Sequence, residues 1–449
     1  MRGLWKELFP GIQNTEKNPL HKGERVCRFG QNRKARNAKK DRLALEQKGL
    51  RLRPSHSDPW HRQFGCATAA YVLKAKVMQS DPLPQQLLNT RYGELARQEH
   101  LLPIKVTRFY QNKIDEEVKV LGHSSGPLHR CVYPTDERLT VRAPHEMADF
   151  VEDNANMPAG LKNTIVRKYR NRILFFPTSS CAAHCQYCFR QDLLAVAHDS
   201  AENNLTVATN NVVNYLKANP DILEVILSGG DPMLLPYSKL QYILSSIGSI
   251  DRPIAIRIHT RMLAFAPSVF TADIAALLSA SRVRLVNHII HPYEVCDVVK
   301  THVSLLTQSG VRLYNQFPII RNVNDHHEVL TMHLMILDEL NIRNLSMFVP
   351  DPINFSASFR ISLNRLFAII DRLNTQTPAW INSTRLVLDT KYGKVRREDL
   401  RVCDPNTNRF IFCRNGQDIF YQDFPKELDH PGELRTLLWK HHEPHATPT

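Results

Sequence analysis

The strongest constraint on the fold is an alternation of two patterns along residues 172–373. Six short runs, rich in apolar, β-branched and aromatic residues, have the length of buried strands. They are Arg172–Pro177, Ile222–Leu227, Ile254–Ile258, Val283–Ile290, Val311–Ile319 and Leu345–Val349. Stretches with helical periodicity follow at 205–218, 236–248, 268–279, 295–308, 326–340 and 359–373. A strand followed by a helix, repeated in this way, predicts a parallel sheet with helices outside it.

Six units are too few for a closed barrel, which needs eight. The alternation therefore predicts an α/β fold that is either a partial, open (β/α)6 barrel or a doubly wound sheet. In both architectures the active residues lie at the C-terminal ends of the strands. We therefore expect reactive motifs directly after the predicted strands.

Shifts in composition predict four regions along the chain. Residues 1–58 are expected to form a basic, partly disordered extension, and 59–165 a mainly helical region. Residues 166–380 hold the partial barrel, and 381–449 a small C-terminal appendage. The appendage has strand candidates at Arg385–Leu388, Arg409–Cys413 and Asp418–Tyr421.

The overall composition excludes several classes of protein. Of the 449 residues, 43% are hydrophobic and 23% are charged, which excludes wholesale disorder. No apolar stretch is long enough to span a membrane, and the N-terminus lacks the pattern of a secretory signal. The nine cysteines are an odd number with one tight cluster, so they indicate a reducing, cytoplasmic location rather than a disulfide scaffold.

The positive charge is concentrated in the N-terminal extension. Residues 1–60 hold fifteen Lys or Arg against six Asp or Glu, so they account for nine of the fourteen net positive charges. The basic run at 33–42 could contact nucleic acid or an acidic partner. A solvated, partly disordered extension explains it equally simply, and the segment has few aromatic residues to stack on bases, so nucleic acid is not the expected partner.

Three cysteines lie close together just after the first predicted strand. Cys181, Cys185 and Cys188 have the spacing C-x3-C-x2-C. Three thiolates can bind three irons of a 4Fe–4S cluster and leave the fourth iron open for chemistry. A zinc ion bound by these thiolates and His184 is an alternative, although no second cysteine pair follows at a suitable spacing. Three unrelated core cysteines are a further alternative.

This spacing, with an aromatic residue beside the last cysteine, resembles that of the radical S-adenosylmethionine (SAM) superfamily. In that superfamily the amino and carboxylate groups of SAM chelate the open iron. The segment Gly229-Gly230-Asp231 follows the second predicted strand and is similar to the superfamily element that contacts the SAM amino group. Alone it would read as an ordinary turn, but its place after that strand supports the resemblance.

A narrower resemblance, from about residue 145 to about residue 420, is to the lysine 2,3-aminomutase family. The matching segments are Tyr169–Arg172, Cys181–Arg190, Leu227–Pro232, Arg257–Arg261, His288–Glu294, Asn315–Gln316, Arg321–Asp325, and Asp351 with Phe359-Arg360. The resemblance implies a partial (β/α)6 barrel of the radical SAM type that uses a 4Fe–4S cluster, SAM and pyridoxal 5′-phosphate (PLP). It implies an isomerase that moves an α-amino group to the neighbouring carbon through a 5′-deoxyadenosyl radical. The resemblance also implies a flavodoxin- or ferredoxin-type electron donor, and it is compatible with a homo-oligomer.

The resemblance also assigns roles to single residues. It implies that Arg172 holds the PLP phosphate and that Arg190 pairs with the substrate carboxylate, tasks that suit a guanidinium group. It implies that His288 and Gln316 line the SAM site. Without the family, Arg172 reads as a surface cation, Arg190 as a side chain packed beside the cluster, and the other two as satisfied core residues.

The lysine that holds PLP is expected in the stretch from Leu388 to Val395. Family members usually have several glycines there, whereas this chain has only Gly393. Lys394 is the first candidate and Lys391 the second, because each is near that glycine. Such a lysine reacts as the neutral amine, so it needs a desolvated or cationic pocket. Two surface lysines in a basic turn are the simpler reading.

Two acids bear on the substrate. Asp351 and Asp389 match family positions that hold the distal ammonium of lysine, so the resemblance implies a free cationic amino acid, with L-lysine first and ornithine or arginine as relatives. Each aspartate could instead cap a helix or turn. Phe348 stands where the family often has a tyrosine, which removes a hydroxyl group near PLP or substrate and suggests a divergent substrate or weakened PLP binding.

Other functions remain open at this point. One is an aminomutase that modifies a lysine side chain of elongation factor P, although that branch generally lacks the second acid. Another is a PLP-independent or RNA-related radical SAM protein, read from the basic extension. A third is a family member that keeps the cluster but serves as a binding or regulatory protein.

Overall fold

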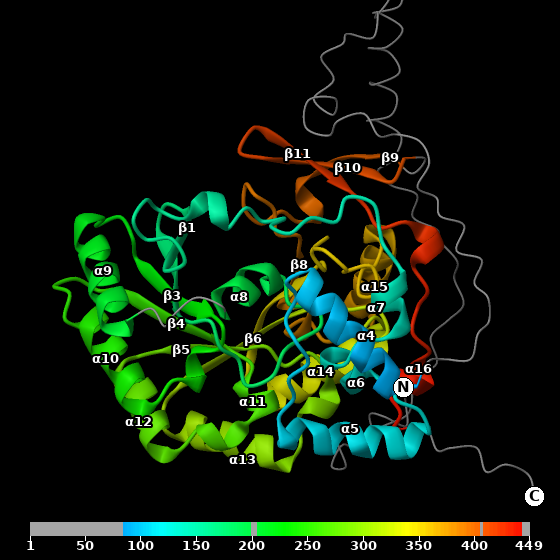
Figure 1. The fold of residues 1–449 in the computed structure, drawn as a ribbon, viewed down its shortest axis with the longest axis horizontal. Coiled ribbons are helices and arrows are strands. Elements are labelled where there is room, and N and C mark those ends of the chain that lie inside the picture. Colours follow the sequence, from blue (N-terminus) through cyan, green and yellow to red (C-terminus); the bar gives the residue numbers. More distant parts are fainter. Residues whose placement is uncertain (1–83, 199–203, 405–406, 442–449) are drawn as a thin grey trace, which may run out of the picture. The chain divides into compact units, whose positions relative to one another are not determined.

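The computed structural model describes residues 84–198, 204–404 and 407–441 (Figure 1). Every described residue belongs to the second of the two units into which the chain divides, Asp81–Thr449. The predicted basic extension and the first part of the predicted helical region therefore lie outside the described residues. The region boundaries at 58, 165 and 380 stay predictions.

An eight-stranded sheet forms the centre of the second unit, with the strands side by side in chain order. The strands are β1 (Ile165–Tyr169), β2 (Arg172–Thr178), β3 (Glu224–Gly229), β4 (Ala255–Thr260), β5 (Arg284–Asn287), β6 (Arg312–Pro318), β7 (Arg343–Phe348) and β8 (Arg385–Val387). The pair β1–β2 is antiparallel, and every later pair is parallel. Since the two edge strands do not pair with each other, the barrel is open, and the predicted partial barrel is confirmed.

A helix follows each strand from β2 to β7, as the alternating pattern predicts. These helices are α9 (Leu205–Ala218), α10 (Tyr237–Gly248), α12 (Ala272–Ala280), α13 (Asp297–Gln308), α14 (His327–Glu339) and α15 (Leu363–Gln376). Two shorter helices, α8 (Gln191–His198) and α11 (Met262–Phe265), lie in the connections after β2 and β4. Figure 1 shows α9, α10, α12 and α13 around the outside of the strands.

The main core lies between the sheet and this outer layer of helices. Leu227, Ile258 and Leu285, on three successive strands, are fully buried and belong to one cluster with Val212 and Val299 on the helices. Burial of such large apolar side chains is the main stabilising contribution to a domain of this kind. The core therefore holds the strands in place so that their C-terminal ends meet at one edge.

In the described part of the chain, four α-helices precede the sheet, and a small second sheet follows it. The helices are α4 (Gln85–Gln98), α5 (Arg108–Leu121), α6 (Pro127–Val132) and α7 (Asp136–Thr140). The small sheet contains β9 (Leu400–Asp404), β10 (Arg409–Arg414) and β11 (Gln417–Gln422), and is followed by α16 (Leu434–Leu437). The sequence patterns predicted β8, β10 and β11 but neither β1 nor β9. Within the described residues, no helix is both long enough and apolar enough to cross a membrane.

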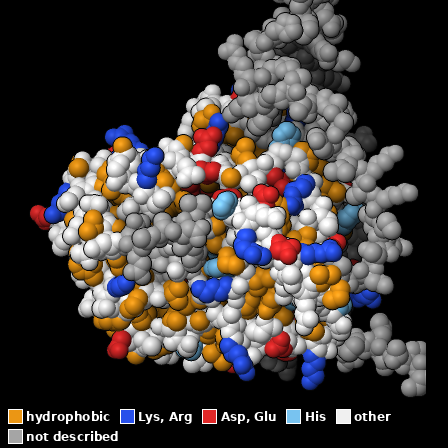
Figure 2. All heavy atoms as spheres, viewed as in Figure 1, with side chains coloured by type: hydrophobic (Ala, Val, Ile, Leu, Met, Phe, Trp, Pro, Cys, Tyr) orange, Lys and Arg blue, Asp and Glu red, His pale blue; other side chains and the backbone are white. Residues whose placement is uncertain are grey.

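Charge on the described surface is mixed. On the face shown in Figure 2, Lys and Arg side chains alternate with Asp and Glu side chains over the described residues. A nucleic-acid interface usually gathers basic side chains along one face or one helix. The described part of this face does not have that character.

Candidate active site

A cavity of about 470 Å³ lies inside the open barrel. Strand β2 contributes Arg172 and Leu174 to its wall, and β4 contributes Arg257 and His259, because alternate residues of a strand face the same side. All thirteen residues that the sequence predicts for the site line this one cavity. They are Arg172, Cys181, Cys185, Cys188, Arg190, Gly229, Gly230, Asp231, His288, Gln316, Asp351, Asp389 and Lys394.

The sheet explains why residues so far apart in sequence meet. The cysteine loop follows β2, the Gly-Gly-Asp segment follows β3, and His288 follows β5. Asp351 and Asp389 lie just beyond β7 and β8. Since these strands are parallel, their C-terminal ends share one edge, as expected for a barrel active site. Arg172 is the exception that the sequence also predicted, because it begins β2.

The Gly-Gly-Asp segment packs directly on the loop that carries the cysteines. The Gly230 N–H donates to the Thr178 carbonyl at 2.9 Å, and the Asp231 N–H donates to the Ser180 carbonyl at 2.9 Å. A Cβ atom on Gly230 would lie 2.3 Å from the Ser180 carbonyl oxygen, and Gly229 has a φ of +97°. Both positions therefore require glycine, one for close approach and the other for its backbone conformation.

The three cysteines suit a cluster better than a single ion. Burial raises the pKa of all three thiols, to about 12 for Cys188, so they need bound metal to become thiolates. Three thiolates can bind three irons of a cluster and leave the fourth iron open, whereas a structural zinc ion needs a fourth protein ligand. His184, the fourth ligand of the zinc alternative, has its Nδ1 2.7 Å from the Pro103 carbonyl oxygen.

Asp231 is a buried carboxylate fixed by several donors. The Thr260 hydroxyl donates to Oδ1 at 2.7 Å, and the Arg261 N–H donates to Oδ2 at 2.8 Å. The Met233 N–H is a third donor, at 3.1 Å from Oδ1. Burial raises the pKa of Asp231 to about 6, although the hydrogen bonds oppose the shift. Such a carboxylate can accept a hydrogen bond from an ammonium group beside the cysteines.

An amide bridges two histidines at the centre of the cavity. Gln316 Nε2 lies 3.3 Å from His259 Nδ1 and 3.2 Å from His288 Nε2. Burial lowers the pKa of His288 to about 3 and lowers the pKa of His259 well below its ordinary value, so both rings are neutral at pH 7. Both facing nitrogens can therefore accept from the amide, which orients the rings.

Some buried donors in the wall are left for a ligand. Among the described residues, Tyr187 Oη, His259 Nε2 and Arg261 Nη1 have no hydrogen-bond partner. All three residues line the cavity. Because buried polar atoms are normally hydrogen-bonded, these donors indicate a cavity built for a polar ligand such as SAM or PLP.

Arg190 is held in place by a carboxylate and a hydroxyl. Its Nε donates to Asp153 Oδ2 at 3.0 Å, and its Nη1 lies 3.3 Å from Ser228 Oγ. Its guanidinium carbon also lies 4.3 Å from the centre of the Phe189 ring. The guanidinium is thus fixed at the cavity wall, where further N–H groups are available to a carboxylate.

The short turn before Lys394 brings that lysine into the cavity. Leu388 and Val395 exchange two backbone hydrogen bonds of 2.9 Å, so the turn between them closes tightly. Gly393 has a φ of +104° and passes within 3.3 Å of the Tyr169 ring, measured from an added Cβ. Lys391 instead lies 3.2 Å from Glu152 and does not line the cavity.

The surroundings of Lys394 favour its neutral form. Burial lowers the pKa of Lys394, and Arg257 and Arg172 lower it further, while Asp389 and Asp351 oppose the shift. Its Nζ lies 4.2 Å from the centre of the Phe348 ring, so the unusual phenylalanine packs on the candidate lysine. A lysine with a lowered pKa is suited to attack a carbonyl group.

The two predicted acids share the cavity with a further cation. The pKa of Asp351 is raised to about 8, mainly by burial and next by Asp389, whereas Lys168 and Lys394 oppose the shift. Lys168 Nζ lies 3.5 Å from Asp389 Oδ1. Asp389 is therefore already paired within the protein.

Sequence reasoning missed several residues of the cavity wall, among them Lys168, Asp153 and Arg257. Arg257 lies on the strand predicted at Ile254–Ile258, and His259 follows it directly, while the observed β4 contains both. Their spacing of two residues was the available signal that both face the same side. Lys168 lies on β1, a strand that the patterns did not predict, and Asp153 lies in a connection. No local signal marks either of them.

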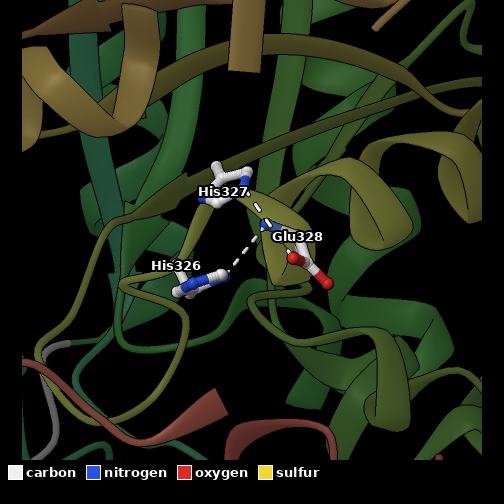
Figure 3. A group of neighbouring side chains, drawn as sticks. All are labelled: His326, His327 and Glu328. Atoms are coloured by element: carbon white, nitrogen blue, oxygen red, sulfur yellow. Dashed lines mark hydrogen bonds and ion pairs between the residues drawn. The ribbon is translucent and has the colours of Figure 1, made fainter. Parts of the chain in front are cut away.

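A second group of metal-ligand side chains lies elsewhere (Figure 3). His326, His327 and Glu328 lie at the start of α14, and none of them lines the cavity. His326 Nδ1 accepts a hydrogen bond from the Glu328 N–H at 3.2 Å, so it caps the helix. Glu328 Oε1 also lies 3.9 Å from His327 Nε2, and Figure 3 shows the three side chains close together. The helix cap and this contact account for the arrangement without a metal ion.

The cavity can be compared with known proteins. Residues 170–257 match a family model described as a 4Fe-4S single cluster domain. The L-lysine 2,3-aminomutase of Buchnera aphidicola subsp. Baizongia pistaciae is 31% identical over 288 residues, which are 64% of this chain and 81% of that relative. The L-lysine 2,3-aminomutase of Escherichia coli K12 is 27% identical over 283 residues, 63% of this chain and 79% of that relative.

Similarity to solved structures is much weaker. The crystal structure of a radical SAM methyltransferase from Sphaerobacter thermophilus covers 51% of this chain and 72% of its own, with 12% identity and a TM-score of 0.35.

Proposed function

Because this chain belongs to the lysine 2,3-aminomutase family, we propose that it is a radical SAM, PLP-dependent 2,3-aminomutase of a cationic amino acid, with L-lysine as the first candidate. The observation that carries the proposal is the convergence of thirteen predicted residues on one cavity. They come from the ends of different strands, so chance proximity along the chain does not explain it. The enzyme would be an isomerase.

In this proposal one part of the cavity holds the cluster and SAM. Cys181, Cys185 and Cys188 bind three irons, and the fixed carboxylate of Asp231 accepts from the SAM amino group. His288 and Gln316, which hold each other through a 3.2 Å contact, orient the rest of SAM. Reduction of the cluster is assigned to a flavodoxin- or ferredoxin-type donor.

Another part binds PLP and the substrate. Arg172 pairs with the PLP phosphate, and Lys394 supplies the amine that anchors the cofactor, a role its lowered pKa supports. Arg190 orients the substrate carboxylate, and Asp351 and Asp389 receive the distal ammonium. When bound, the cluster with SAM supplies a radical that abstracts hydrogen, and PLP supplies an electron-accepting group.

The protein's own contribution is to orient the reactants and to exclude water. Phe189, Phe265, Phe348 and Phe359 line the same cavity as the charged residues. Aromatic walls of this kind keep water away from a reactive intermediate and strengthen the polar contacts that hold the substrate.

The proposal is tested with full-length protein, reconstituted anaerobically with iron, sulfide and PLP. After addition of SAM, L-lysine and dithionite, we expect β-lysine by mass spectrometry, and borohydride should trap PLP on Lys394. Lys394→Ala should lose the PLP adduct, whereas Lys391→Ala, the matched control outside the cavity, should keep it. Cluster absorption without any PLP adduct or β-amino acid would refute the PLP-dependent activity and favour a PLP-independent radical reaction.

A further inference from the structure

Lys168 is a cation built into the part of the cavity proposed for the substrate side chain. It lies on β1, and its side chain is only 9% exposed. Its Nζ donates to the Val151 carbonyl at 3.0 Å and lies 3.5 Å from Asp389 Oδ1. The contact with the main chain fixes the ammonium, so the ion pair with Asp389 does not depend on a freely moving surface lysine.

Lys168 is the cation that forms an ion pair with Asp389. Lys394 also interacts electrostatically with Asp389, but it is the residue proposed to bind PLP, and the arginines of the cavity wall have other contacts. Arg190 is paired with Asp153 at 3.0 Å, and Arg257 is 3.3 Å from Glu224. Arg172 stacks on the Tyr169 ring, with 3.9 Å between its guanidinium carbon and the ring centre. Among the described residues, no ion pair other than the one with Lys168 involves Asp389 or Asp351.

Two acids facing a substrate ammonium would favour a cation strongly, but a fixed ammonium beside one of them cancels part of that charge. We propose that Lys168 is a specificity-determining residue: by pairing with Asp389 it leaves Asp351 as the acid outside any ion pair, facing the substrate side chain. This inference rests on the proposed function, because it concerns the same pocket.

As a consequence, the protein should prefer amino acids with a charged side chain over those with a neutral one less strongly than it would if neither Asp351 nor Asp389 were paired. L-Norleucine has the carbon chain of L-lysine without the terminal ammonium, so the ratio of the two dissociation constants isolates the contribution of that charge. Lys168 lowers the preference for L-lysine in two ways. Its ammonium repels the substrate ammonium, and its ion pair with Asp389 makes that carboxylate less available to the substrate.

The test measures binding of both amino acids by calorimetry to reconstituted, PLP-loaded full-length protein without SAM, so that no turnover occurs. Lys168→Met removes the charge and keeps the length of the side chain. We expect the preference for L-lysine over L-norleucine to increase about tenfold, which corresponds to about 1.4 kcal/mol. Lys300→Met is the matched control, because Lys300 pairs with Asp297 on an outer helix and lies away from the cavity.

A double-mutant cycle separates pairing with Asp389 from a general effect of charge. In the cycle with Asp389→Asn, the double variant should return close to the wild-type ratio, because both members of the ion pair are then neutral. Lys168→Arg should keep the wild-type ratio. If Lys168→Met does not fold, Lys168→Gln serves instead, since its amide can still donate to the Val151 carbonyl.

The outcomes distinguish this inference from the proposed function. An unchanged or reduced preference in the Lys168 variants, with normal binding to the wild type, overturns the role of Lys168 alone. If those variants instead lose PLP absorbance, Lys168 holds the cofactor and the inference also fails. If the wild type binds neither amino acid and forms no PLP adduct, the proposed function and this inference fail together.

Discussion

A single methyl group on Gly230 should disrupt the loop that carries the cluster cysteines. Its Cβ would lie 2.3 Å from the Ser180 carbonyl oxygen, and 2.6 Å and 2.7 Å from backbone atoms of Ser179 and Ser180. Ordinary contact begins at 3.4 Å, so one of the two backbones must move by about 1.1 Å. Because the clash is with main-chain atoms, no side-chain rotation can relieve it.

The displacement would reach the cluster in two ways. Ser180 immediately precedes Cys181, so the first sulfur would shift relative to the other two. The hydrogen bond from the Asp231 N–H to the Ser180 carbonyl would also be strained. Overpacking of a close contact costs roughly 1–3 kcal/mol, and we expect a loss of this size in the apo protein of Gly230→Ala.

The assay combines iron and sulfide content, the cluster absorption band and thermal unfolding of the apo protein. Gly230→Ala should hold far less iron than the wild type after identical reconstitution. Gly248→Ala is the control, because nothing lies within 4 Å of its added Cβ and it ends a helix. A Gly230→Ala protein with full iron content and an unchanged melting temperature would refute the close-packing argument.

Three further predictions concern other parts of the molecule. Cys185→Ala should lose the iron–sulfur absorption and most bound iron, and a normal iron content would contradict its role as a ligand. The pKa of Asp351 is about 8, so this carboxyl group ionises as the pH rises toward 8. The preference for L-lysine over L-norleucine should therefore grow with rising pH, by up to about tenfold per pH unit, and level off above pH 8. Asp351→Asn should abolish this pH dependence in calorimetric titrations. Glu117 accepts from the Leu128 and His129 N–H groups at 2.8 and 2.9 Å, so Glu117→Ala should lower the free energy of unfolding by about 1–3 kcal/mol in denaturant titrations, and an unchanged midpoint would contradict this.

The barrel could be predicted because its pattern is local and repeated. Each strand from β2 to β7 is a short apolar run, and each following helix has its own apolar face, so neighbouring residues carry the signal. The edge strands β1 and β9 do not have such a local apolar pattern. Strand β1 ends in Arg167-Lys168-Tyr169 and β9 has only intermediate or exposed residues, so tertiary pairing rather than an apolar run makes them strands.

The residues of the site could be predicted where a motif is short and chemically specific. The three cysteines form one short motif and the Gly-Gly-Asp segment forms another. Because active residues of such barrels lie at the C-terminal ends of the strands, both motifs could be assigned to the active site. Lys168 lies on the first strand of the sheet and Asp389 lies just beyond the last one, so only the curvature of the open barrel brings the two residues together. The family resemblance implied a role for Asp389 in binding the substrate ammonium, but it did not indicate that Lys168 forms an ion pair with Asp389.

Two departures from the family pattern meet at one contact. By the family resemblance, the turn before Lys394 is shorter than usual, and Phe348 stands where a tyrosine is frequent. In the structure the ring of Phe348 lies 4.2 Å from Lys394 Nζ, and Gly393 is the glycine that lets the turn pass the Tyr169 ring. A single glycine suffices because the backbone bonds between Leu388 and Val395 already close the turn. Each change is therefore compatible with a lysine that enters the cavity, and neither argues by itself against PLP binding.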